Sequence, residues 1–128
     1  MSSPVQANPA RILVVEDEAL LLFSIADDLQ DEGYEVLTAT NADEAIALLV
    51  KHPEIQLIFT DIDMPGSMDG LKLSAMVRDR WPPVRIIVTS GKQRPGANLL
   101  PKDARFLPKP YTTAGVVATM RAELARGA

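Results

Sequence analysis

Acidic residues, one threonine and one lysine stand at the ends of apolar runs along this chain of 128 residues. In chain order they are Glu16 and Asp17 after the run 12–15, Asp61 after 57–60, Thr89 at the end of 84–89, and Lys109 after 106–108. If the runs are parallel strands, their carboxyl ends meet at one edge of a sheet, where ligands of open α/β folds bind. Neighbouring carboxylates repel each other, and a hard cation such as Mg²⁺ relieves that repulsion. A lysine at the same edge suits a phosphoryl group.

Five segments have the composition of strands that could place these residues. They are short, apolar and rich in β-branched side chains, which is typical of strands buried on both faces. The predicted strands cover 12–15, 35–40, 57–60, 84–89 and 106–109.

Helical periodicity fills most of the sequence between the predicted strands. Between Glu18 and Glu32, apolar residues recur at i, i+3, i+4 and i+7, namely at Leu22, Ile25, Ala26 and Leu29. Asn41 and Glu44 form a capping-box-like start of a second helix that ends before Pro53. Leu73, Met76 and Val77 mark a third helix, which ends at Trp81, a packing residue, before Pro82 and Pro83. Thr112 or Thr113 caps a last helix with Val117, Met120 and Leu124 on one stripe.

The alternation of strands and helices predicts an α/β fold with a parallel sheet and helices on both faces. If the strand order is 2-1-3-4-5, Asp17 and Asp61 face each other across the crevice at the switch point. The segment 91–103 holds two glycines and two prolines, which oppose a helix. We therefore expect a weak or irregular fourth helix there, and the least ordered internal segment of the chain.

The composition and net charge of the chain argue against several classes of function. Apolar residues make up 47% of the chain and charged residues 23%, as in a single globular domain, which we place at 11–128 behind a flexible leader at 1–10. The absence of cysteine excludes disulfides and thiolate metal sites, and we expect His52, the one histidine, to face solvent rather than bind a ligand. A net charge of −4 without a basic run argues against nucleic-acid binding. No apolar stretch approaches the ~20 residues of a membrane span, so we expect a cytoplasmic protein.

Five motifs in the same order resemble the receiver domain of bacterial two-component response regulators. The spacing agrees as well, because 44 positions separate Asp17 from Asp61 and 20 separate Thr89 from Lys109. The motifs are Ile12-Leu-Val-Val-Glu-Asp-Glu18, Asp61-Ile-Asp-Met-Pro65, Met68-Asp-Gly70, Ile87-Val-Thr-Ser90 and Phe106-Leu-Pro-Lys-Pro110. The resemblance covers about 11–126 and implies a flavodoxin-like (βα)5 fold, a doubly wound parallel sheet in the order 2-1-3-4-5.

The resemblance also implies a metal-dependent phosphoacceptor. Asp61 would accept the phosphoryl group, Asp17 would bind Mg²⁺ directly, and Glu16 would bind it through water. The backbone carbonyl of Asp63 would be the third protein ligand of the metal.

Other residues are expected to hold the phosphoryl group and to report its presence. Thr89 would donate a hydrogen bond to one phosphoryl oxygen and Lys109 would pair with another. Thr89 and Phe106 would form the switch, with the rotamer of Phe106 reporting the state. The Lys109–Pro110 peptide bond is expected to be cis.

The function implied is that of a stand-alone receiver without an output domain. It would take a phosphoryl group from a histidine kinase or a histidine phosphotransfer protein, and lose it by hydrolysis of the labile acyl phosphate. It would signal by protein contact or act as a phosphate sink. One departure from the common pattern is the loop at Gly66 and Ser67, which is one residue longer.

Two other interpretations remain. A haloacid-dehalogenase-like phosphatase would use Asp61 and Asp63 as nucleophile and acid, but that family carries Thr or Val where this chain has Pro65. An adaptor that is never phosphorylated would be favoured if Asp17, Asp61 or Lys109 were missing, and all three are present.

Overall fold

Five parallel strands form a single sheet at the centre of the protein. The computed structural model describes residues 9–64, 69–91 and 99–126. The strands are β1 (Arg11–Val15), β2 (Glu35–Ala39), β3 (Leu57–Asp61), β4 (Arg85–Ser90) and β5 (Arg105–Pro108). All neighbours pair in parallel, in the order β2-β1-β3-β4-β5. The predicted fold class and strand order are confirmed, and the fold is flavodoxin-like.

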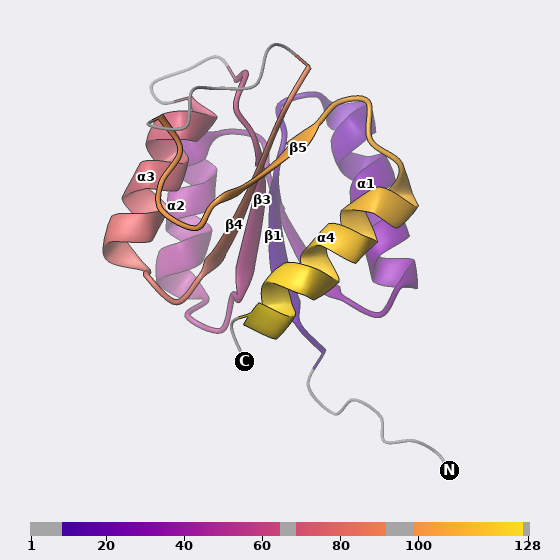
Figure 1. Cartoon of the computed structure of the whole chain (residues 1–128), viewed down its shortest axis with the longest axis horizontal. Coiled ribbons are helices and arrows are strands. Elements are labelled where there is room, and N and C mark those ends of the chain that lie inside the picture. The colour runs from indigo at the N-terminus through magenta and orange to yellow at the C-terminus, as the bar shows by residue number, and fades with distance from the viewer. Residues whose placement is uncertain (1–8, 65–68, 92–98, 127–128) are drawn as a thin grey trace.

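Two layers of helices enclose this sheet (Figure 1). The described residues contain the α-helices α1 (Ala19–Asp31), α2 (Ala42–Lys51), α3 (Gly70–Arg80) and α4 (Thr113–Arg126). Helices α1 and α4 cover one face, and α2 and α3 cover the other. None of the helices within the described ranges is long and apolar enough to cross a membrane.

Parts of three predictions lie outside the described residues. These parts are 1–8 of the leader, the loop at Gly66 and Ser67, and 92–98 of the expected irregular helix. The described remainder of that last segment, Gly91 and 99–103, contains no α-helix.

The alternation of side chains along the strands separates two apolar clusters. In β1, Ile12 and Val14 pack against α1 and α4, whereas Leu13 and Val15 pack against α2 and α3. The apolar stripe predicted for α1 is the set of residues that the helix buries: Leu22, Ile25, Ala26 and Leu29. Because strands β1, β3 and β4 are buried on both faces, their carboxyl ends are held by the core on each side.

Side-chain caps set the start of three helices. For α4 the cap is Thr112, whose Oγ1 accepts a hydrogen bond of 3.0 Å from the backbone N–H of Gly115. Asn41 Oδ1 accepts a hydrogen bond of 2.9 Å from the backbone N–H of Glu44, as predicted for the start of α2. The Glu44 carboxylate reaches one residue further back than in a standard capping box, to the backbone N–H of Thr40. Asp69 caps α3 through the N–H of Lys72.

Gly70 begins α3 where the helix touches the end of β3. A Cβ atom at this position would lie 2.0 Å from the carbonyl oxygen of Asp61. The Gly70 N–H also donates to the carbonyl of Ile62 at 3.1 Å. Only glycine allows this close approach, so Gly70 fixes where α3 begins relative to the last residue of β3.

A buried acidic residue ties α4 to the sheet. Glu123 is fully buried, and its oxygens lie 3.1 Å from Arg85 Nη2, 3.1 Å from Arg105 Nη2 and 3.0 Å from Arg126 Nη1. Arg85 and Arg105 are the first residues of β4 and β5. The predicted apolar stripe of this helix is therefore incomplete, since Glu123 lies among its buried residues beside Met120.

We expect Glu123→Ala to lower the free energy of unfolding by about 3–5 kcal/mol, because it leaves the half-buried guanidinium of Arg85 without its carboxylate. Chemical denaturation monitored by circular dichroism measures the change. Glu32→Ala is the matched control, since Glu32 pairs with Arg121 at 3.5 Å on the exposed surface. Equal losses in the two variants would contradict a special role for the buried pair.

Candidate functional site

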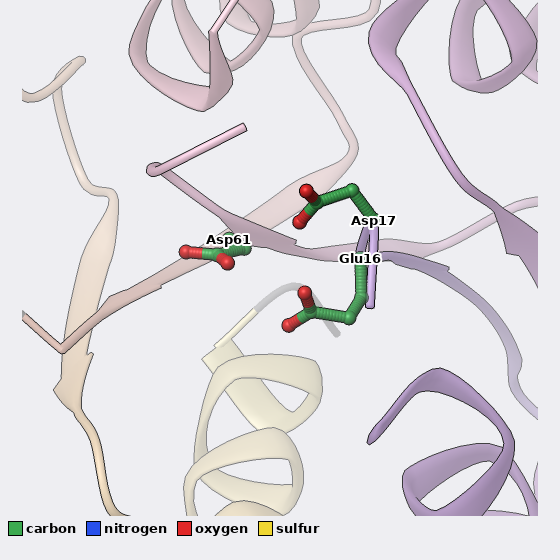
Figure 2. A group of neighbouring side chains, drawn as sticks. All are labelled: Glu16, Asp17 and Asp61. Carbon is green, nitrogen blue, oxygen red and sulfur yellow. The ribbon is translucent and has the colours of Figure 1, made fainter. Parts of the chain in front are cut away.

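Three carboxylates converge at the carboxyl edge of the sheet. Glu16 and Asp17 follow β1, and Asp61 is the last residue of β3. One oxygen of each side chain lies within 4.8 Å of the others. Figure 2 shows the carboxylates of Glu16 and Asp17 pointing to the side on which Asp61 lies. Glu16 and Asp61 are buried and Asp17 is exposed, so the cluster opens to solvent on one side.

Burial and the neighbouring carboxylate of Asp61 disfavour the ionised form of Glu16. Its burial raises the pKa of its carboxyl group, and the nearby charge of Asp61 raises that pKa further. The backbone N–H of Glu18, which donates to Glu16 Oε2 at 3.1 Å, and the charge of Lys109 act in the opposite direction. The net shift is upward, so the cluster favours a cation that could neutralise it.

Lys109 is the lysine that the sequence predicts at this edge of the sheet, and it contacts two of the three carboxylates. Its Nζ lies 3.0 Å from Asp61 Oδ2 and 3.3 Å from Glu16 Oε1. Burial by itself lowers the pKa of Lys109, but the hydrogen bonds and charges of Asp61 and Glu16 outweigh it and the net pKa is raised. The ammonium group therefore stays charged. The peptide bond between Lys109 and Pro110 is cis, as predicted.

Thr89 offers a free hydroxyl beside Asp61. The two residues are register partners on β4 and β3, and Thr89 is 2% exposed. Within the described parts of the chain, Thr89 Oγ1 has no hydrogen-bond partner. A buried hydroxyl without a partner is costly, which favours an acceptor supplied by a ligand.

The remaining predicted residues lie around this centre. The backbone N–H of Asp63 donates to Asp61 Oδ1 at 3.0 Å, and Asp63 Oδ2 accepts from Ser90 Oγ at 2.6 Å. Phe106 is half-buried in β5 and packs on the side of α2 and α3. His52 lies away from the site, directly after α2, with Nδ1 3.1 Å from Glu54 Oε2. It is half-buried, so the prediction that it faces solvent is only partly correct.

A hollow of about 350 Å³ opens beside Lys109. Leu21, Gly91, Pro110 and Tyr111 form the rest of its lining. Burial, followed by the charge of Glu16, raises the pKa of Tyr111 to about 12, so its hydroxyl stays protonated. The roles of Tyr111, Ser90 and Gly70 do not follow from the sequence pattern, because each depends on contacts between distant segments.

The donor set fits Mg²⁺. Carboxylate oxygens are the hard ligands that this ion takes, commonly one or two of them together with water and a phosphate. Glu16, Asp17 and Asp61 supply such oxygens, and Lys109 is the one cation within hydrogen-bond distance of them in the described structure. Three carboxylates and one ammonium leave a negative excess that a divalent cation offsets.

Comparison with known proteins assigns the chain to a family. The model of the response regulator receiver domain matches residues 12–121. A probable transcriptional regulatory protein of Picosynechococcus sp. is 35% identical over 127 aligned positions, which cover 91% of this chain and 50% of the relative. The hydrogenase transcriptional regulatory protein HoxA of Cupriavidus necator is 43% identical over 82 positions, which cover 64% of this chain and 16% of the relative. The chain thus spans half or less of the length of these relatives.

Solved structures agree with the sequence match. A response regulator receiver protein from Sinorhizobium medicae superposes with a TM-score of 0.88 at 27% identity, covering 96% of this chain and 100% of that one. A CheY-like receiver domain protein from Methanospirillum hungatei gives a TM-score of 0.82 at 27% identity, covering 94% and 97%. Receiver domains generally bind Mg²⁺ in an acidic pocket such as the one formed by the three carboxylates. This chain belongs to the family of response regulator receiver domains.

Proposed function

We propose that Asp61 accepts a phosphoryl group from a phosphohistidine donor in a Mg²⁺-dependent reaction. The observation that carries this proposal is the setting of the Asp61 carboxylate: it contacts Lys109 Nζ at 3.0 Å and lies in register with the unpartnered hydroxyl of Thr89. An Asp61 oxygen attacks phosphorus, a P–O bond forms, and the P–N bond to the donor imidazole breaks. The imidazole nitrogen keeps the electron pair of that bond and takes up a proton.

Each neighbouring side chain has a defined task in this step. Lys109 neutralises charge on one phosphoryl oxygen, and the Thr89 hydroxyl donates a hydrogen bond to another. Asp17, Asp61, the backbone carbonyl of Asp63 and, through water, Glu16 would hold Mg²⁺, which would supply positive charge against the phosphoryl oxygens. The resulting acyl phosphate is hydrolysed by water, which returns Asp61 to its carboxylate.

The donor is a histidine kinase or a histidine phosphotransfer protein. A protein of this kind must bring its imidazole to Asp61, and the hollow lined by Lys109, Leu21 and Tyr111 lies beside that path. On α1, the helix that contributes Leu21, the side chains of Leu20 and Phe23 are 81% and 62% exposed. We propose that these two exposed apolar side chains of α1 form part of the surface on which the donor protein docks.

We also propose bounds, switch residues and a cellular role for the domain. Residues 11–128 form the receiver, and Thr89 with Phe106 forms the switch that responds to phosphorylation. The receiver signals through protein contact or serves as a phosphate sink, and its net charge of −4 opposes contact with nucleic acid. Because the phosphoryl group of either donor originates from ATP, we place the receiver in the cytoplasm.

Asp61→Asn removes the nucleophilic oxygen at nearly constant size, so we expect the variant to gain no phosphoryl group. Incubation with Mg²⁺ and a small acyl phosphate, followed by intact mass measurement, detects one added group on the wild type. Asp27→Asn, the same change at an exposed position of α1, is the control and gains one group like the wild type. Turnover of many small phosphate esters by the wild type, abolished by Asp63→Asn, would instead support the phosphatase interpretation.

Mg²⁺ should stabilise the fold, because an ion that binds only the native state adds RT ln(1 + [L]/Kd) to the free energy of unfolding. At ten times Kd the gain is about 1.4 kcal/mol. Thermal melts with and without Mg²⁺ measure it, and we expect Asp17→Ala to abolish the response. Asp27→Ala, an exposed change on α1, should keep it. A melting temperature of the wild type that ignores Mg²⁺ would contradict the metal site.

Phe23→Ala should slow phosphorylation by a phosphorylated histidine phosphotransfer protein about tenfold, as expected for an aromatic side chain in an interface. Phosphorylation by a small acyl phosphate should not change, because Phe23 is exposed and is not one of the residues around Asp61. Val50→Ala is the matched control, since Val50 is 61% exposed on α2, across the sheet. Equal slowing with both donors would place Phe23 in the chemical step rather than in docking.

A further inference from the structure

A short hydrogen bond joins the end of β4 to the segment that follows β3. The hydroxyl of Ser90 donates to Asp63 Oδ2 at 2.6 Å, the length typical of an O–H donor on an ionised carboxylate. Ser90 is 2% exposed and Asp63 is half-buried, so water competes little for this bond. Hydrogen bonds of this kind are about twice as strong as neutral ones.

Hydrogen bonds therefore hold both the backbone and the side chain of Asp63. Its backbone N–H donates to Asp61 Oδ1 at 3.0 Å, while its side chain is bound to Ser90. The preceding residue is also fixed, because the Ile62 N–H donates to the carbonyl of Thr89 at 2.8 Å. The Met64 N–H, which shares a peptide group with the Asp63 carbonyl, donates to the carbonyl of Ile62 at 3.0 Å. Together these bonds fix the backbone and the side chain on both sides of the Asp63 carbonyl.

Ser90 is itself well anchored. It is the last residue of β4, and its carbonyl accepts a hydrogen bond of 2.9 Å from the backbone N–H of Lys109. The buried Ser74 offers a contrast, because its hydroxyl donates to the carbonyl of Leu71 within its own helix α3. The Ser90 bond instead connects the end of β4 to the segment that follows β3, at the acidic edge of the sheet.

We propose that Ser90 is a positioning residue for the metal site: by holding the Asp63 side chain, it keeps the Asp63 backbone carbonyl oriented as a metal ligand. The inference rests on the metal site of the proposed function. The bond also keeps the Asp63 carboxylate, a further negative charge, directed at Ser90. Without the hydroxyl, the carbonyl is no longer preorganised and the ion binds less tightly.

Isothermal titration with Mg²⁺ alone tests this role without any phosphoryl chemistry. We expect Ser90→Ala to raise the Kd for Mg²⁺ about tenfold, the usual effect of losing a hydrogen bond that orients a metal ligand. Ser90→Cys, which keeps the volume but donates weakly, should behave like Ser90→Ala. Ser90→Thr keeps the hydroxyl and should bind Mg²⁺ nearly as well as the wild type. Ser74→Ala should lower the melting temperature without changing the Kd.

A double-mutant cycle shows whether Ser90 acts through Asp63. Asp63→Ala should weaken binding on its own, and adding Ser90→Ala should weaken it no further. Independent, additive losses would overturn the proposal, as would an unchanged Kd in both Ser90→Ala and Ser90→Cys. If Ser90→Ala does not fold, the comparison of Ser90→Cys with Ser90→Thr gives the same answer.

The outcome also separates this inference from the proposed function. A wild type that binds Mg²⁺ and is phosphorylated on Asp61, with no effect of Ser90, contradicts only the positioning role. A wild type that binds Mg²⁺ but gains no phosphoryl group contradicts phosphorylation and leaves the Ser90 result valid. A wild type that binds no Mg²⁺ overturns both.

Discussion

Mutual repulsion among Glu16, Asp17 and Asp61 is the constraint around which the structure is built. Three carboxylates with oxygens within 4.8 Å of one another are unfavourable without a cation, and Lys109 supplies only one positive charge. The core must hold them together. It does so because β1 and β3 are adjacent, buried on both faces, and rigidly packed, so that neither strand end can move away from the other.

Carboxylates are surrounded by cations at one edge of the sheet and outnumber them at the other. At the amino edge, the carboxylate of Glu123 is enclosed by three guanidinium groups, from Arg85, Arg105 and Arg126. At the carboxyl edge, acids outnumber the cation and the Thr89 hydroxyl has no partner among the described residues. In the first arrangement the protein itself neutralises the buried carboxylate, whereas the second keeps a negative excess. This difference distinguishes a structural ion-pair network from a binding site.

Local patterns in the sequence predicted the elements well and the contacts between them poorly. The stripe of α1 and the cap at Asn41 depend on residues a few positions apart, so periodicity and propensity identified them. The acidic edge was predictable because the carboxyl ends of parallel strands meet at one edge of a sheet. Glu123 and the close approach of Gly70 to Asp61 depend instead on segments far apart in the chain. No short-range signal distinguishes these two residues from an ordinary helix glutamate or turn glycine.

The end of β4 shows how one strand can serve both a ligand and a loop. Side chains of consecutive strand residues point in opposite directions, so Thr89 and Ser90 cannot address the same partner. The hydroxyl of Thr89 is unpartnered within the described structure, whereas that of Ser90 is bound to Asp63. A shift of Thr89 toward a phosphoryl oxygen must carry Ser90 along the same backbone. The bond from Ser90 to Asp63 therefore couples the position of Thr89, which we propose as a switch residue, to the loop that we assign to the metal.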